Sequence, residues 1–246
     1  MSNEELNNIM LIDYKNIDVY QGESKVLEGV NFHADEGEFI YIIGKVGSGK
    51  SSLLKTFYCE LDIDGGENCT ATVLGRDIPT LKRKDVPALR KEMGIIFQDF
   101  QLLHDRSVRK NLQFVLKATG WKDKKEIDER IEAVLTEVGM IDKIDKMPHE
   151  LSGGEQQRIA ISRAILINPK VIIADEPTGN LDPETASNIV ELLKNITSTG
   201  TAVVMTTHNI PMLDKFPGIV YRCKDGNISD VTAEYNHLDL SEDGEE

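Results

Sequence analysis

The chain has 246 residues, of which 40% are hydrophobic and 28% are charged, values typical of a globular protein with one sizeable core. Its formal net charge of −14 at pH 7 argues against nonspecific binding to nucleic acid and direct adsorption to anionic lipid, since both are negatively charged. No apolar run approaches the roughly 20 residues that cross a bilayer, so we expect no direct membrane insertion and any membrane role to require a partner.

The N-terminal part of the chain predicts strands that lead into a glycine-rich loop. An apolar strand ends at Ile43 and is followed at once by GKVGSGKS at Gly44–Ser51, which fits the phosphate-loop pattern G-x-x-x-x-G-K-[ST]. Apolar residues then recur at helical spacing, and strand, loop and helix together make an anion site from backbone N–H groups and the helix N-terminus. The predicted strands are Ile9–Tyr20, Val26–Ala34 and Phe39–Ile43, and the helical apolar residues are Leu53, Leu54 and Phe57.

The middle of the chain changes in character. A buried strand is predicted at Gly94–Phe97, and helical patterns dominate the stretch that follows it. Asp123 and Glu126 have the spacing of a capping pair at the start of a helix. A further helix is predicted over Leu151–Ile167. We interpret residues 99–168 as a helical subdomain inserted into an α/β core.

The C-terminal part alternates strands and helices again, which indicates an α/β domain with a mainly parallel sheet. After Lys224 the chain has acidic residues but no Lys or Arg. We therefore expect one domain over residues 9–228 and an acidic, flexible tail over 229–246, whose alternative role is docking to a partner. The predicted strands here are Val171–Ala174, Ala202–Thr206 and Ile219–Tyr221, with a helix over Ala186–Thr197.

The cysteine count and the N-terminus bear on the compartment. Cys59, Cys69 and Cys223 are an odd number without the spacing of metal ligands, which favours free thiols in a reducing cytoplasm. The N-terminal MSNEELNN lacks the basic start and apolar middle of a signal peptide. We expect a cytoplasmic protein that is peripheral on the inner face of the cell membrane through its partner.

The glycine-rich loop supplies the groups that hold a nucleoside triphosphate and its metal. Lys50 can reach the β- and γ-phosphates as a compact cation, and the Ser51 hydroxyl is the expected Mg²⁺ ligand. The glycines let the backbone approach the phosphates closely. The close-approach positions are Gly44, Gly47 and Gly49, and the positions expected to contribute mainly backbone contacts are Lys45, Val46, Ser48 and Ser52.

Two acidic residues end the apolar strand in VIIADE, at the carboxyl edge where α/β sheets bind their ligands. Asp175 is expected to hold Mg²⁺, directly or through water, and Glu176 to polarise the attacking water as a general base. An apolar strand that ends in two acids is by itself often only a strand meeting a solvated loop. Combined with the phosphate loop, the two acids predict phosphoryl transfer.

The motif LSGGE at Leu151–Glu155 opens a helix. Its N–H groups and the helix dipole form a second anion site. In this order along the chain, the phosphate loop, LSGGE and VIIADE resemble the ATP-binding-cassette (ABC) ATPases, and the resemblance extends over residues 9–228. It implies a P-loop NTPase (RecA-like) fold, with a mainly parallel sheet core, an N-terminal antiparallel β part and an inserted helical subdomain.

The resemblance also implies roles for further residues. Gln98 matches the glutamine that contacts metal and water, His208 the histidine that contacts the γ-phosphate, and Tyr20 the aromatic residue that stacks on adenine. In the family two subunits sandwich two ATP molecules head to tail, so a homodimer is expected in the ATP state. The residues that would cross to the partner's nucleotide are Ser152, Gly153, Gly154, Glu155 and, in the family's D-loop, Asp182.

Several stretches narrow the resemblance within the family. ADEPTGNLD resembles the group whose membrane partners perform mechanical work, which includes the cell-division, lipoprotein-release and macrolide-export ATPases. FQDFQLL, with DRSV and ATGW, is most similar to the cell-division members. That similarity implies an integral membrane partner of the FtsX type and control of periplasmic peptidoglycan hydrolases. Lipoprotein release, macrolide export and a nucleotide-gated adaptor with slow hydrolysis remain alternatives.

Overall fold

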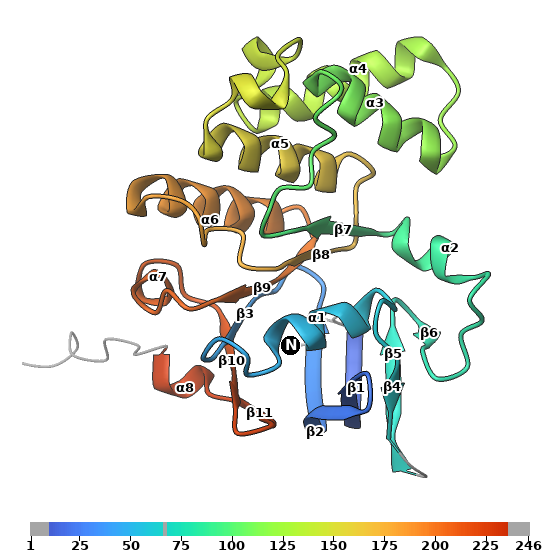
Figure 1. Cartoon of the computed structure of the whole chain (residues 1–246), viewed down its shortest axis with the longest axis vertical. Coiled ribbons are helices and arrows are strands. Elements are labelled where there is room, and N and C mark those ends of the chain that lie inside the picture. The colour runs from blue at the N-terminus through green and yellow to red at the C-terminus, as the bar shows by residue number, and fades with distance from the viewer. Residues whose placement is uncertain (1–9, 66–67, 236–246) are drawn as a thin grey trace, which may run out of the picture.

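The computed structural model describes residues 10–65 and 68–235. It consists of two β-sheets with helix α1 (Lys50–Phe57) between them and a layer of helices on the other side of the second sheet (Figure 1). The first sheet is antiparallel, in the order β2-β1-β5-β6, and β4 also pairs with β1. Its strands are β1 (Met10–Gln21), β2 (Ser24–Asp35), β4 (Ile63–Asp64), β5 (Thr70–Val73) and β6 (Arg76–Asp77).

The second sheet is the core of the fold and has the order β11-β10-β3-β9-β8-β7. All its neighbours pair in parallel except β11, which runs antiparallel to β10. Parallel strands are covered on both faces and therefore carry continuous apolar sequences. The strands are β3 (Phe39–Ile43), β7 (Met93–Ile96), β8 (Val171–Ala174), β9 (Ala202–Thr207), β10 (Ile219–Lys224) and β11 (Asn227–Asp230).

Strand β3 shows how the core sheet divides the interior into two apolar clusters. All five of its residues are buried. Because successive side chains of a strand point to opposite faces, Ile40 and Ile42 join the cluster shared with α1 and the antiparallel sheet. Phe39, Tyr41 and Ile43 join the cluster formed with the helical layer. The sheet is thus held between two separate cores.

The helical layer packs on the second face of the core sheet, and α3, α4 and α5 extend from it as a subdomain (Figure 1). Helix α5 contacts β7 as well as α3, α4 and α6, so it links the subdomain to the sheet. The helices other than α1 are α2 (Val86–Arg90), α3 (Val108–Thr119), α4 (Lys124–Glu137), α5 (Gly153–Ile165), α6 (Pro183–Thr197), α7 (Pro211–Lys215) and α8 (Thr232–Tyr235), with 3-10 turns at Ile141–Lys143 and Pro148–Glu150.

The architecture confirms the predicted fold, a mainly parallel core with an antiparallel β part and inserted helices. The predicted start of the tail at residue 229 is wrong, because 229 lies within β11 and the chain continues into α8 as far as Tyr235. The Thr232 side chain accepts from the Val220 N–H, and Arg222 forms an ion pair with Glu234. These contacts tie the segment to β10. The rest of the predicted tail lies outside the described residues.

Two further expectations can be compared with the structure. Cys59, Cys69 and Cys223 are all free cysteines, as predicted. Within residues 10–65 and 68–235, no helix combines the length and apolar character needed to cross a bilayer.

Asp123 caps the N-terminus of α4, as its spacing from Glu126 predicts. Its Oδ1 accepts a hydrogen bond of 2.9 Å from the Glu126 backbone N–H. Replacing a capping Asp by Ala leaves such an N–H without its partner, so Asp123→Ala should lower the free energy of unfolding by about 0.5–2 kcal/mol. Urea unfolding measures this loss. The neighbouring exposed Lys124→Ala is the control, and an equal loss in both variants would contradict the capping role.

Candidate nucleotide and metal site

The phosphate loop between β3 and α1 depends on glycine at its first position. Gly44 has a φ of 150°, and a Cβ placed there would lie 2.4 Å from the Cys223 carbonyl oxygen and 2.7 Å from the Ser48 Oγ. Gly47 and Gly49, with φ of 78° and 98°, take left-handed conformations that other residues avoid. The loop is therefore close against β10, while Val46 at its tip is 91% exposed.

Lys50 begins α1 and lies almost completely buried, with 4% of its surface exposed. Its Nζ donates hydrogen bonds of 2.9 Å and 3.0 Å to the carbonyls of Gly44 and Lys45. The same Nζ lies 3.9 Å from Glu176 Oε1. A buried ammonium needs such partners to compensate for lost hydration. The cation is thereby held across the mouth of the loop where phosphates would bind.

Asp175 connects three elements at the carboxyl edge of the core sheet. Its Oδ1 accepts a 2.9 Å hydrogen bond from Ser51 Oγ on α1 and a 2.7 Å bond from Thr206 Oγ1 on β9. Thr206 Oγ1 also accepts a 2.8 Å bond from the Glu176 N–H. The structure thus brings together Ser51 and Asp175, two of the three residues predicted to contact the metal, the third being Gln98. The sequence analysis did not identify Thr206, because threonine is common in β-strands and its presence in one does not by itself indicate a functional role.

Glu176 and His208 come from the ends of neighbouring strands and lie within reach of each other. Glu176 Oε2 is 3.4 Å from His208 Nδ1. Glu176 has a φ of 43°, a left-handed conformation that is rare for a residue other than Gly, Asn or Asp and costs roughly 1–2 kcal/mol. Strain of this size persists only where surrounding contacts enforce it, and it clusters at functional sites. Here the Thr206 bond to the Glu176 N–H is such a contact.

Gln98 follows β7 on an exposed loop at the same edge. Its backbone carbonyl accepts a 3.4 Å hydrogen bond from the Asn180 side chain. Asn180 precedes Asp182, which caps α6 by accepting from the N–H groups of Glu184 and Thr185. The Thr185 side chain bonded to Asp182 lowers the pKa of that carboxyl group, which favours its charged form. The structure thus places Asp182 as a helix cap and joins its segment to the Gln98 loop.

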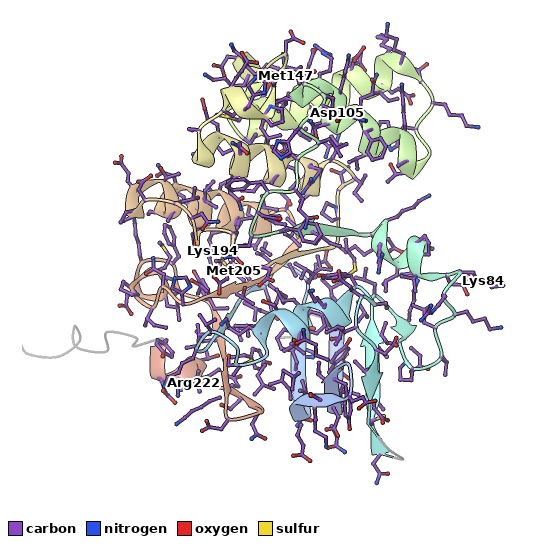
Figure 2. All side chains as sticks on the ribbon, viewed as in Figure 1. Lys84, Asp105, Met147, Lys194, Met205 and Arg222 are labelled. Atoms are coloured by element: carbon purple, nitrogen blue, oxygen red, sulfur yellow. The ribbon has the colours of Figure 1, made fainter. Side chains whose placement is uncertain are left out.

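A cavity of about 650 Å³ lies beside the phosphate loop. Its walls include Val26 of β2, Arg222 of β10 and Tyr235 of α8, besides the loop itself and His208. Figure 2 shows Arg222 beside α8. Tyr20 is not among the lining residues. It lies half-buried in β1, opposite Lys25, the neighbour of Val26 in β2. Tyr20, the residue predicted to stack on adenine, therefore lies on the strand next to the one that lines this cavity.

The second motif opens α5 with a closed capping box. The Ser152 side chain accepts from the Glu155 N–H, and the Glu155 carboxylate accepts a 2.8 Å hydrogen bond from the Ser152 N–H. Glu155 also forms a 3.1 Å ion pair with Lys143. The hydrogen bond from the Ser152 N–H makes the largest contribution to lowering the pKa of Glu155. The Glu155 carboxylate is therefore engaged within its own chain.

The glycines of this motif pack against the start of α6. A Cβ at Gly153 would contact Leu181 at 3.6 Å, and one at Gly154 would lie 2.6 Å from Thr185 Cγ2. Helix α5 packs on one face of the core sheet, whereas α1 packs on the other. The cavity beside the phosphate loop includes no residue of Leu151–Glu155. One chain alone does not bring the two anion sites together.

The residues at the phosphate loop fit a nucleotide with Mg²⁺. Ser48 Oγ is buried and has no hydrogen-bond partner, so it has unused capacity inside the loop. The Ser51 hydroxyl and the Asp175 carboxylate offer the hard oxygen ligands that Mg²⁺ prefers. Among the described residues there is no cluster of three His, Cys, Asp or Glu side chains suited to a metal. Mg²⁺ usually takes one or two carboxylates and completes its shell with phosphate and water.

The role of Thr206 can be tested by two substitutions. Thr206 is fully buried, so Thr206→Val should leave the Glu176 N–H without its acceptor and leave Asp175 Oδ1 with only the hydrogen bond from Ser51. We expect the free energy of unfolding to fall by about 1–3 kcal/mol and ATP turnover to fall with it. Thr206→Ser keeps the hydroxyl and should retain most of both. Urea unfolding and phosphate release measure the effects, and normal turnover in Thr206→Val would reject the assignment.

The comparisons with known proteins agree with this geometry. The profile of the ABC transporter family matches residues 27–179. The cell division ATP-binding protein FtsE of Streptococcus pneumoniae serotype 2 is 40% identical over 222 residues, 89% of this chain and 95% of its own. The Escherichia coli K12 protein of the same name is 40% identical over 212 residues, 85% of this chain and 92% of its own.

Two solved structures are also similar to this chain. The cbiO1 protein of Clostridium perfringens has a TM-score of 0.81 and 30% identity, covering 90% of this chain and 87% of that one. The dimeric, post-hydrolysis ATP-binding cassette MJ0796 bound to ADP and Pi has a TM-score of 0.77 and 31% identity, covering 89% and 97%. Fold, site and relatives agree, and the chain belongs to the ABC transporter family as one of its ATPases.

Proposed function

We propose that this chain is the ATP-hydrolysing subunit of an ABC complex that acts in cell division. In this complex, closure of an ATP-bound homodimer is coupled to an integral membrane partner of the FtsX type, which controls periplasmic peptidoglycan hydrolases. The observation that carries the ATPase part is the joining of Lys50, Ser51, Asp175 and Glu176 at one edge of the sheet. The division role is supported by relatives named cell division ATP-binding protein at about 40% identity.

The proposed hydrolysis uses the residues at this edge in distinct roles. Lys50 binds the β- and γ-phosphates after exchanging its loop carbonyls for phosphate oxygens. A water oxygen attacks the γ-phosphorus, the bond from that phosphorus to the ADP oxygen breaks, and Glu176 accepts the proton of the water. His208, 3.4 Å from Glu176, contacts the γ-phosphate. Gln98, from its loop, would contact the water and the metal.

Magnesium would be held by Ser51 and Asp175, with Gln98 as a further contact. When bound, Mg²⁺ neutralises the charge that develops on the phosphate oxygens. The protein's own part is to keep the two ligand side chains together. The Ser51 hydroxyl bonds Asp175 Oδ1 directly, and the Thr206 hydroxyl bonds the same oxygen.

The active unit is proposed to be a head-to-tail homodimer. The motif Leu151–Glu155 presents the N-terminus of α5, and that end would face the γ-phosphate bound by the partner subunit. Two observations support this arrangement. The motif does not line the cavity beside its own phosphate loop, and two similar solved structures of the ATP-binding cassette MJ0796 are dimeric.

A surface on α3 is the proposed seat of the membrane partner. Phe114 is 52% exposed, and the Arg106 guanidinium lies 5.5 Å from its ring centroid. Lys110 and Lys117 line the same shallow hollow of about 360 Å³. Figure 2 shows Asp105, at the edge of this hollow, on the helical layer. We propose that the partner's coupling helix contacts this hollow and the adjoining loop after Gln98.

This assembly would place the chain in the cytoplasm, on the inner face of the membrane. The alternatives are lipoprotein release or macrolide export with a different membrane partner, and a nucleotide-gated adaptor that hydrolyses ATP slowly. The site retains a base, a cation and metal ligands in contact range, which favours measurable turnover.

Removing the proposed base should trap the closed dimer. Glu176→Gln keeps the size of the side chain but cannot accept the proton, so ATP should remain bound and the dimer should persist. Size-exclusion chromatography with light scattering, with and without saturating Mg-ATP, measures this. Adding Lys50→Ala to the same chain removes ATP binding and should restore the monomer. A Glu176→Gln chain that stays monomeric at saturating ATP would reject the sandwich mechanism.

The identity of the partner can be measured by affinity purification of the tagged chain from its own membranes, followed by mass spectrometry. We expect an FtsX-like membrane protein, and its recovery should fall with Phe114→Glu, which puts a charge on the proposed seat. Lys124→Glu, an exposed change on α4, is the control. Recovery of a lipoprotein-release or export permease instead would keep the ATPase and change the function.

A further inference from the structure

The loop after Gln98 contains two consecutive residues in a strained backbone conformation. Phe100 and Gln101 have φ of 60° and 46°, in the left-handed region. Neither is Gly or Asn, the residues that tolerate this region, so each adopts a backbone conformation that costs free energy. The turn contains backbone hydrogen bonds from the Phe100 N–H to the Phe97 carbonyl and from the Gln101 N–H to the Asp99 carbonyl. Something outside the loop must stabilise this shape.

Arg163 of α5 makes the contacts that stabilise it. Its Nη2 donates a 2.9 Å hydrogen bond to the Phe100 carbonyl, and its Nη1 donates to the Gln101 carbonyl. The guanidinium therefore binds both strained residues at once. Burial lowers the pKa of Arg163, and the nearby Asp99 carboxylate opposes this effect. A desolvated guanidinium that lost these two carbonyls would be left partly unsatisfied.

The loop is fixed at two further points. The Asn180 amide donates to the Gln98 carbonyl from the segment before α6. At its other end, Leu103 exchanges hydrogen bonds with the Asn111 side chain of α3, through its N–H at 2.8 Å and its carbonyl at 3.0 Å. Of these contacts, only those of Arg163 come from α5, the helix that begins at Leu151–Glu155.

We propose that Arg163 is a positioning residue for ATP hydrolysis. By fixing the strained turn at Phe100 and Gln101, Arg163 keeps Gln98 in the position that hydrolysis requires. Because Arg163 lies on α5, a movement of the helix that would contact the partner's nucleotide moves the Gln98 loop directly. The inference rests on the proposed role of Gln98 in hydrolysis. It predicts that loss of the Arg163 contacts changes the rate of hydrolysis rather than the binding of ATP.

The opposing interpretation is that Arg163 only anchors the helical subdomain. The chain offers a matched control for it. Arg130 of α4 donates hydrogen bonds to the Ile165 and Leu166 carbonyls at the C-terminal end of the same helix, and burial lowers its pKa as well. Its third hydrogen-bond partner among the described residues is Asn168, which lies outside the Gln98 loop. Arg130→Gln therefore removes an equivalent anchor away from the site.

The experiment compares four variants of the full chain. For Arg163→Gln, Arg163→Lys, Arg130→Gln and Gln98→Ala, we would measure kcat for ATP, the Kd of a fluorescent ATP analogue and the melting temperature. A positioning error of about 1 Å can lower a rate up to about a hundredfold, so we expect kcat of Arg163→Gln to fall at least about tenfold. The Kd should stay within about twofold, and Arg163→Lys should recover part of kcat. Arg130→Gln should keep kcat despite a similar loss of melting temperature.

Each other outcome has a defined meaning. If Gln98→Ala lowers kcat but Arg163→Gln does not, the positioning role is overturned and the proposed function stands. Equal losses of kcat in Arg163→Gln and Arg130→Gln also overturn it. If Gln98→Ala keeps full kcat, the proposed role of Gln98 fails, and the inference fails with it.

A second pair of variants covers the case in which Arg163→Gln does not fold. Gln101 is exposed, and Gln101→Pro fixes φ near −65°, which is incompatible with the observed turn. It should lower kcat without weakening ATP binding. Gln101→Asn tolerates the left-handed region and should keep kcat. Full kcat in Gln101→Pro would overturn the inference.

Discussion

The hydrogen bonds to Asp175 hold the nucleotide site together. One carboxylate oxygen accepts hydrogen bonds from Ser51 of α1 and Thr206 of β9, and Asp175 itself directly follows β8. Three elements that are distant in sequence are therefore fixed at one atom. Thr206 also accepts a hydrogen bond from the Glu176 N–H, and this contact stabilises the left-handed backbone conformation of Glu176. The proposed base and the proposed metal ligands thus share one support.

The helical subdomain is joined to this edge by a small number of polar contacts across α5. Two arginines bind backbone carbonyls here, Arg163 of α5 at the Gln98 loop and Arg130 of α4 at the C-terminus of α5. The N-terminal glycines of α5 pack on the start of α6. A rigid helix held at several points transmits a displacement at one end to the other. This is the physical basis on which nucleotide binding, the proposed dimer contact and the proposed partner surface on α3 can be coupled.

Local patterns predicted much of the fold and the site. The strand Phe39–Ile43 and the strand Val171–Ala174 have the predicted bounds, because a buried parallel strand is a continuous apolar run between turn residues. The short strands β4, β5 and β6 could not be predicted. They have two to four residues and take their shape from pairing with β1 and with each other rather than from their own sequence. The end of the domain was placed too early for a related reason, since β11 is short, largely exposed and stabilised by pairing with β10.

Within the site, motifs predicted which residues meet but not how they are held. Lys50, Ser51 and Asp175 follow from local motifs, whereas Thr206 becomes visible only when two strands lie side by side. The left-handed turn at Phe100 and Gln101 could not be predicted, because it contains no glycine. It is stabilised instead by an arginine 62 residues further along the chain. The adenine position of Tyr20 rests on the family resemblance alone. Tertiary contacts of this kind leave no pattern in a single sequence.

The contacts of Lys50 have a consequence for the energetics of nucleotide binding. The ammonium bonds two carbonyls of its own loop. A phosphate that binds Lys50 must therefore replace these hydrogen bonds by its own. The loop should consequently discriminate by charge, because only an anion that offers Lys50 more than two neutral carbonyls can displace them.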